Sequence, residues 1–277
     1  MAKQLTTHNG VPAVFYQSAP GDTDEGWDGG AQYPRISFMI YMQGDAERQS
    51  SGQLVLDSMS IDTGPAPEEI ESAVMALLQD VFMTPDDGIP CCLAWARSDG
   101  FSENTTEDYN GIQGFVGVTT TFDVFSFPRQ LTTTPDPIAA VGNYLKAQAA
   151  GATLIGTDKL PDYYTATAKG PAFYARLEAL GKDRVTNAVA WMTANIAVHI
   201  FAPTSEARLA WLRILVDHLA CDEEMTLSDG SPLFLLDIQA DSSAAYTTTG
   251  QLHISTKYGI LRQAPGGGKT LDTVTIR

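Results

Sequence analysis

The chain has 277 residues, of which 44% are hydrophobic, and 33 Asp and Glu outnumber 17 Lys and Arg to give a formal net charge of −16. This length and composition fit a chain with packed cores and room for two domains. The acidic balance argues against a surface that wraps nucleic acid, because phosphate binding depends on Lys and Arg. It is compatible with like-charge repulsion that keeps molecules apart, or with a surface past which DNA moves without binding.

The amino terminus, MAKQLTTHNG, lacks the apolar stretch of a secretory signal. No run reaches the roughly 18 apolar residues that a membrane helix needs. The three cysteines, Cys91, Cys92 and Cys221, have no C-x-x-C spacing, which argues against a zinc or redox motif. We therefore expect synthesis in a cytoplasm and no membrane partner, cofactor or metal.

The first polar segment is GDTDEGWDGG at 21–30, which predicts a solvated acidic loop. Its spacing resembles half of a calcium loop, but the glycine and the closing glutamate are out of register. Trp27 is unusual in such a loop, and an exposed aromatic side chain often contacts a partner protein. The candidate partner-contact residues here are Asp22, Asp24, Glu25, Trp27 and Asp28.

An alternating strand follows at 53–59, with Leu54 and Leu56 on one face. The next segment, EEIESAVMALLQDVF, comes after Pro65 and Pro67 and has helical spacing. Its predicted buried face consists of Ile70, Val74, Leu77, Leu78 and Val81. MTPDDGIP at 83–90 then predicts a tight turn, before a strand in CCLAWARSD.

A second acidic loop is predicted in ENTTEDYNG at 103–111. Long loops between paired strands are natural docking elements, so Glu103, Glu107, Asp108 and Tyr109 are further candidate contact residues. The loop leads to the final strand of the first half. One face of that strand is predicted to carry Val116, Val118, Thr120, Phe122 and Val124.

The second half repeats this order of elements. MTLSDGSP at 225–232 matches MTPDDGIP at five of eight positions, with every position number raised by 142 (83 + 142 = 225). The same shift takes Leu54 to Ile196 and reaches a second helix, capped by Thr204 or Ser205. The predicted face of that helix is Leu209, Leu212, Val216 and Leu219. A shift of 136 takes the final strand onto Leu252, Ile254, Thr256, Tyr258 and Ile260 (116 + 136 = 252).

The two halves agree less well at their starts. VPAVFY at 11–16 resembles GPAFY at 170–174, and YPRISFMIYM at 33–42 is expected to correspond to RVTNAVAWM at 184–192. The second half begins with an extra predicted helix after Pro135 and Pro137, which the first half lacks.

The seam at 128–137 is rich in Pro and Thr, as a linker should be, and the period is too long for a solenoid. We predict a first copy at 1–130 and a second at 131–277, with a flexible tail from about 264. The expected fold is α+β: two tandem copies of a mixed or antiparallel β-sheet unit with flanking helices.

No catalytic pattern stands out. His8, His199, His218 and His253 are scattered, and His199 and His253 are expected on the strand faces opposite the apolar rows. PGGGKT at 265–270 lacks the first glycine of a phosphate loop, and no G-x-S-x-G elbow is present. We expect exposed or hydrogen-bonded histidines and no catalytic, cofactor-binding or metal site.

Six segments of the second half, taken in order, resemble the small tail-completion proteins of tailed bacteriophages, which include the tail terminators. They are PDPIAAVGNYLKA, GTDKLPDYY, GPAFYARL, AWMTANIAVHIFAP, DGSPLF and GQLHISTKYGILR. The resemblance covers about residues 135–263, and the first half looks like a diverged copy of the same unit. It implies an α+β virion protein that forms a ring, often sixfold, through which DNA passes, and it implies no catalytic residue.

The resemblance also implies partners and a location. Family members usually carry one domain, so six chains, which we favour, or three chains would suit a sixfold or twelvefold neighbour. The ring would lie in the virion between the tail-tube protein and the head-completion or connector proteins, after synthesis in the host bacterial cytoplasm. Two alternatives remain: a soluble non-viral adaptor that binds a protein through the Trp27 loop, and an enzyme with a pocket between domains.

Overall fold

The computed structural model describes residues 7–8, 11–20, 33–42, 51–61, 64–86, 88–109, 112–130 and 132–262. The chain divides into two compact units. Unit 1 consists of Met1–Pro128 together with Lys159–Thr165, and unit 2 consists of Arg129–Asp158 together with Ala166–Arg277. The short segment Lys159–Thr165 therefore comes from the second half of the sequence but belongs to the first unit.

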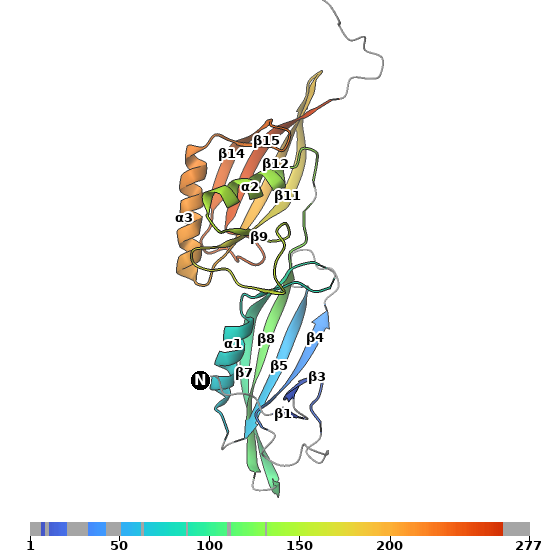
Figure 1. The fold of residues 1–277 in the computed structure, drawn as a ribbon, viewed down its shortest axis with the longest axis vertical. Coiled ribbons are helices and arrows are strands. Elements are labelled where there is room, and N and C mark those ends of the chain that lie inside the picture. The colour runs from blue at the N-terminus through green and yellow to red at the C-terminus, as the bar shows by residue number, and fades with distance from the viewer. Residues whose placement is uncertain are drawn as a thin grey trace, which may run out of the picture. The chain divides into compact units, whose positions relative to one another are not determined.

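Unit 1 contains a seven-stranded sheet in the order β10–β6–β7–β8–β5–β4–β3. Figure 1 labels β7, β8, β5, β4 and β3 of this sheet. All neighbouring strands are antiparallel except β3 and β4, which are parallel. A separate pair of short strands, β1 (Thr7–His8) and β2 (Val11–Pro12), precedes the sheet. The strands of the sheet are β3 (Val14–Tyr16), β4 (Arg35–Met42), β5 (Gly52–Ile61), β6 (Phe82–Met83), β7 (Cys91–Tyr109), β8 (Ile112–Ser126) and β10 (Tyr163–Tyr164).

Unit 2 contains a six-stranded sheet in the order β13–β14–β15–β12–β11–β9. Its neighbours are antiparallel except β9 and β11, which are parallel. The strands are β9 (Thr153–Leu154), β11 (Ala172–Val185), β12 (Val189–Phe201), β13 (Glu224–Thr226), β14 (Pro232–Ala240) and β15 (Leu252–Leu261).

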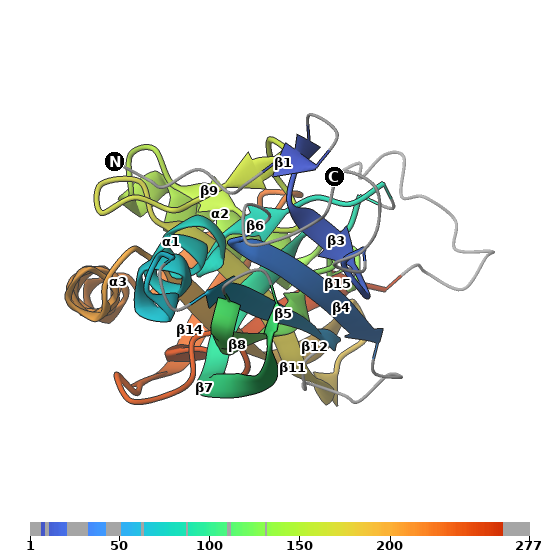
Figure 2. The same cartoon turned by 90° about the horizontal axis from the view of Figure 1, so that it is seen from below.

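Helices cover one face of each sheet. In unit 1, α1 (Pro67–Leu78) packs on β5, β7 and β8, and the view in Figure 2 shows it on one side of these strands. In unit 2, α2 (Pro137–Gln148) packs across β11 and α3 (Ser205–Cys221) lies along β14 (Figure 1). The two helices and the covered face of the sheet enclose the core of unit 2.

Side-chain caps define where α2 and α3 begin. The Asp136 carboxylate accepts a hydrogen bond of 2.9 Å from the backbone N–H of Ile138. Thr204 Oγ1 accepts one of 3.2 Å from the backbone N–H of Ala207. Each bond satisfies an N–H group that the first helical turn leaves without an intrahelical partner. Of the two residues expected to cap α3, the structure selects Thr204.

The two sheets share one topology, because six strands follow in the same order and the same directions. The predicted shift of 142 in position number relates β6 and β7 to β13 and β14. Phe82 pairs with Cys92 in unit 1, and Glu224 pairs with Phe234 in unit 2 (82 + 142 = 224, 92 + 142 = 234). A bulge also interrupts both β7 and β14 where they pair with the next strand. The prediction of an α+β fold with two similar tandem units is confirmed.

The starts of the two units correspond differently from the prediction. By position in the sheet, β4 is the equivalent of β11 and β3 is the equivalent of β9. The expected matches of 11–16 with 170–174 and of 33–42 with 184–192 are therefore wrong. Short similar sequences are a poor guide here, because the place of a strand is set by its pairing partners rather than by its own composition.

The last strands are also offset differently. Leu54 pairs with Phe122, while Ile196 pairs with Ile254, so the shift between the final strands is 132 rather than 136 (122 + 132 = 254). The two shifts differ by an even number, and an even slip leaves the same side chains on the same face. The predicted face of β15 is accordingly confirmed, with Leu252, Ile254, Thr256 and Tyr258 all buried.

Two leucines predicted to be buried in helices are exposed instead. Leu77 is 72% exposed and Leu209 is 54% exposed. In α1 the row that faces the sheet contains the buried Ile70 and Val74, and Leu77 lies to the side of that row. In α3 the buried face is Leu212, Leu215 and Leu219. The prediction places Leu209 where the structure has Leu215, although both keep a helical spacing to Leu212.

The core of unit 1 contains polar side chains where unit 2 has apolar ones. Ser58 and Thr120 are fully buried in unit 1. By strand pairing their equivalents in unit 2 are Ile200 and Leu252. Neither the Ser58 nor the Thr120 hydroxyl has a hydrogen-bond partner among the described residues. A buried hydroxyl without a partner costs about 1–3 kcal/mol, so unit 1 carries a penalty that unit 2 avoids at these positions.

We predict opposite effects for two Thr→Val substitutions. Thr120→Val removes a buried hydroxyl without a partner and should raise the free energy of unfolding of unit 1 by about 1–3 kcal/mol. Thr256→Val is the matched control, because Thr256 is equally buried but donates a 3.0 Å hydrogen bond to the Ala194 carbonyl. It should lower stability by about 1 kcal/mol. Calorimetry of both variants tests this, and equal destabilisation by both would contradict it.

Candidate functional site

The outer edge of β6 in unit 1 is covered by β10. Tyr163 pairs with Met83, and Tyr164 pairs with Phe82. The backbone N–H of Thr84 also donates to the Asp162 carbonyl at 3.4 Å. The buried ring of Phe82 contacts Tyr164 and Phe127, with ring centroids 6.2 and 5.6 Å away. Strand pairing and aromatic packing together hold the segment Lys159–Thr165 on this edge.

The corresponding edge of unit 2 is β13, and no described strand pairs with its outer side. Met225 is buried, while Glu224 and Thr226 are exposed. The backbone N–H of Leu235 donates to the Glu223 carbonyl at 3.0 Å, which fixes the inner hydrogen bonds of β13. Alternation along an antiparallel strand then turns the N–H and C=O groups of Glu224 and Thr226 outward. This edge can accept another strand.

An apolar groove adjoins this edge between α3 and β14. Its volume is about 720 Å³, and its wall includes Val216, Leu219 and Ile238. Leu236 at its margin is 56% exposed. Asp222, Glu223 and Asp237 add negative charge to its lining. The groove reaches Glu223, the residue before β13, so the groove and the edge strand adjoin there.

A partly buried polar cluster lies on the face of the unit 2 sheet opposite the helices. It consists of Arg176 and Glu178 on β11, His199 on β12 and His253 on β15. Arg176 Nε donates to His199 Nε2 at 3.3 Å, and an Arg176 Nη2 lies 3.4 Å from Glu178 Oε1. Glu178 Oε2 lies 2.9 Å from His253 Nδ1. The cluster alternates donors and acceptors across three neighbouring strands.

The geometry fixes His199 as a neutral imidazole. Because Nε2 accepts from Arg176, the proton must be on Nδ1, which donates to the Tyr246 carbonyl at 2.7 Å. Burial lowers the pKa of His199 to about 4, and the neighbouring Arg176 charge acts in the same direction. Arg176 also donates to the Thr248 and Thr249 carbonyls. The cluster thus fastens the connection between β14 and β15 to the sheet, which is a structural role.

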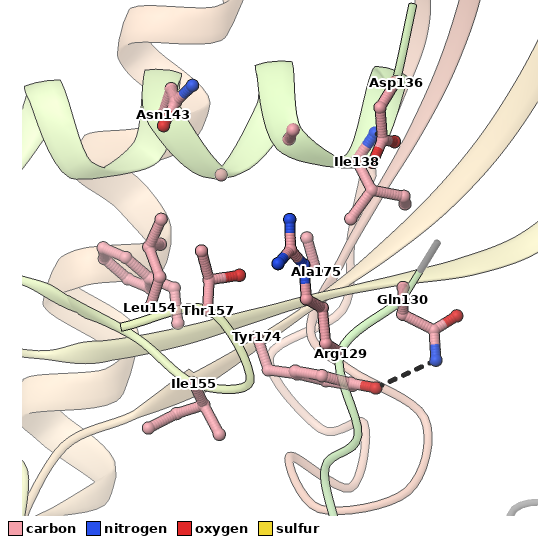
Figure 3. A pocket seen from close by; sticks show the side chains of 13 residues that line it. Arg129, Gln130, Asp136, Ile138, Asn143, Leu154, Ile155, Thr157, Tyr174 and Ala175 are labelled. Atoms are coloured by element: carbon pink, nitrogen blue, oxygen red, sulfur yellow. Dashed lines mark hydrogen bonds between the residues drawn. The ribbon is translucent and has the colours of Figure 1, made fainter. Parts of the chain in front are cut away.

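A small cavity lies between α2 and the strands β9 and β11 (Figure 3). Its volume is about 60 Å³. The Arg129 side chain reaches toward α2, and Gln130 donates a 3.1 Å hydrogen bond to the Tyr174 hydroxyl. Burial is the main cause that raises the pKa of Tyr174. Ligand pockets for organic molecules are typically about 300–1,000 Å³, so this cavity has room for a few water molecules.

The described residues offer little for metal or redox chemistry. No group of three His, Cys, Asp or Glu side chains among them is placed to hold a metal ion. Within the same residues the three cysteines form no disulfide, and Cys92 is fully buried. Burial raises the pKa of the Cys92 thiol, followed by the nearby charge of Asp80. This environment disfavours the thiolate that reactive cysteines need.

Only some of the predicted contact residues lie in the part of the chain that the structure describes. Asp22, Asp24, Glu25, Trp27 and Asp28 lie outside the described residues, as does the predicted tail from about 264.

The second predicted loop is instead a strand. Glu103, Glu107, Asp108 and Tyr109 all belong to β7. Glu103 pairs with Phe115 and Tyr109 with Ile112 in β8, and the register is irregular between Asn104 and Tyr109. The polar composition of 103–111 predicts a loop, but pairing at Glu103, Asn104 and Tyr109 extends the strand into this segment, because strand pairing depends on the backbone and not on the side chains.

Sequence reasoning misses two features of the site. It places His199 and His253 correctly on the polar faces of their strands, yet treats each as isolated. Arg176 and Glu178 show the same alternation in β11, and that pattern is the available signal. The open edge at β13 is recognised by comparison with β6, whose edge is covered by β10. Because the sequence does not predict β10, it does not reveal this difference between the two edges.

The polar cluster makes stability depend on pH. An unfolded histidine takes up a proton near pH 6.5, but folded His199 does so only near pH 4. Stability should therefore fall as the pH drops from 6.5 to 4, by about 3 kcal/mol at most. His199→Gln should flatten this part of the profile, and the exposed His218→Gln is the control. Urea unfolding at several pH values measures the slopes, and parallel slopes for His199→Gln and the wild type would contradict the assignment.

None of the helices in the described part of the chain is long and apolar enough to cross a membrane. Compared with known proteins, the sequence matches no family model and no curated protein.

Proposed function

We propose that this chain is a structural protein of a tailed-bacteriophage virion, which forms a ring at the junction between tail and neck. In this role it resembles a tail terminator or tail-completion protein that caps the tail tube and lets DNA pass. Its partners are further copies of itself, the tail-tube protein and the head-completion or connector proteins. The role is one of assembly rather than catalysis.

The observation that carries the proposal is the correspondence between the six family-like segments and unit 2. These segments supply α2, the connection after β9, the start of β11, most of β12, the turn before β14 and the whole of β15. Apart from residues 159–164, which form the segment that pairs with unit 1, they all belong to unit 2, and the topology of unit 2 recurs in unit 1. A chain with two such units suits a ring in which six or three chains supply twelve or six units.

Two further observations favour assembly over catalysis. The open β13 edge and its apolar groove are suited to binding a protein, whereas the cavity beside Arg129 is small. The net charge of −16 suits a lumen through which DNA passes, because phosphates are repelled rather than bound.

We expect the chain in purified phage particles from a strain that encodes it, in three or six copies per particle. Quantitative mass spectrometry against the major capsid protein measures this number. Deletion of the gene should leave filled heads and tails unjoined in electron micrographs, and a plasmid copy should restore joined particles.

Absence of the chain from purified particles, together with normal joining in the deletion strain, would overturn the proposal. The adaptor would then be the better explanation, and affinity capture of a single cellular partner would support it.

A further inference from the structure

Unit 1 and unit 2 differ at one equivalent place, the outer edge of β6 and β13. In unit 1 the backbone N–H of Leu93 donates inward to the Val81 carbonyl, and that of Thr84 donates outward to Asp162. In unit 2 the bond from Leu235 to Glu223 repeats the inward contact (93 + 142 = 235, 81 + 142 = 223). The outward position equivalent to Thr84 is Thr226, for which no described strand supplies an acceptor. β13 therefore has the geometry of β6 without its covering strand.

The segment that covers β6 comes from a defined connection. Lys159–Thr165 lies between the parallel strands β9 and β11. Unit 1 has the same parallel pair, β3 and β4, joined by residues 17–34. The central part of that connection, 21–32, lies outside the described residues. Each unit therefore has an outer sheet edge, at β6 or β13, and a connection between its two parallel strands. Among the described residues only the β6 edge is covered by such a connection.

The two connections differ in length by three residues, since Val14 and Leu154 pair with the equivalent residues Ile36 and Phe173, but they can be aligned from the strands that follow them. Arg35 and Ala172 are equivalent, because they pair with Met59 and Phe201, which are themselves related by the shift of 142 (59 + 142 = 201). Tyr164 and Trp27 stand at the same distance before these two positions (172 − 164 = 35 − 27). Trp27 thus occupies the sequence position of the aromatic residue that packs on Phe82.

We propose that the outer edge of β13 binds a second copy of this chain, by strand addition from its β3–β4 connection. The contact repeats between chains the pairing of β10 with β6, with Trp27 beside Glu224. It joins two different surfaces of the protein, so it propagates head to tail and closes into a ring when the rotation allows. The inference rests on the self-assembly in the proposed function and assigns it a surface.

The chemistry of this contact has two opposing parts. Main-chain hydrogen bonds supply the affinity in strand addition, and the indole N–H of Trp27 is a donor that suits the Glu224 carboxylate. Acidic side chains stand on both partners, with Asp222, Glu223 and Glu224 at the edge and four carboxylates in 22–28. Salt screens such repulsion, so assembly should strengthen as ionic strength rises from about 0.05 to about 0.5 M.

Thr226→Pro tests the edge in the full-length chain. Proline removes one outward N–H and leaves the inward bonds of Glu223 and Met225 in place. Thr226→Ala is the control, because it keeps the N–H and loses only an exposed side chain. Light scattering after size exclusion should give an oligomer for the wild type and for Thr226→Ala, and 29.8 kDa, one chain, for Thr226→Pro. Trp27→Ala should weaken assembly in the same direction without altering unit 2.

The outcomes separate the surface from the function. An oligomer that survives in Thr226→Pro, with native circular dichroism in all variants, would overturn this inference and leave the particle experiment to decide the proposed function. A wild type that stays at one chain at every concentration and salt tested would overturn the inference as well. Loss of assembly in both Thr226→Pro and Trp27→Ala, with Thr226→Ala unchanged, would support it.

Discussion

The outermost strand of a β-sheet carries N–H and C=O groups that no neighbouring strand satisfies, and this constraint governs both units. Helices cover one face of each sheet but cannot pair with an edge, so each edge needs another strand, water or a partner. In unit 1 a short strand from the second half of the sequence covers β6. In unit 2 the equivalent β13 has no such cover among the described strands. One topology, used twice, thus leaves an asymmetric molecule.

The two units also differ in the side chains that they bury. Unit 2 buries an apolar face under two helices, and its buried His199 is held by hydrogen bonds at both ring nitrogens. Unit 1 has one described helix and buries Ser58 and Thr120 without hydroxyl partners among the described residues. Each of these hydroxyls costs about 1–3 kcal/mol, which unit 2 avoids at the equivalent positions. The same copy supplies the connection that we assign to assembly.

What can be predicted from the sequence follows from how local each feature is. The helices, a cap at Thr204 or Ser205 and the buried face of β15 depend on spacing within one segment, and the sequence predicts them. The equivalence of β4 with β11, the true shift between the last strands and the Arg176 cluster depend on pairing between distant segments. β10 escapes prediction for a related reason, since so short a strand carries no periodic signal. The candidate contact residues in β7 are predicted as a loop, because the prediction relies on their polar composition and cannot include pairing with β8. The candidate contact residues at 22–28 stay a prediction.

The assignment of Lys159–Thr165 to unit 1 has a consequence for the order in which the molecule can be completed during synthesis. The ribosome has finished Pro128, the end of the continuous part of unit 1, well before it reaches Thr165. At roughly 5–20 residues per second, the sheet of unit 1 waits about 2–7 seconds for its last strand. During that interval the β6 edge is open, and α2 and β9 emerge before the strand that closes it. During synthesis the chain therefore has an open edge at β6, and among the described strands of the finished protein the equivalent open edge is at β13.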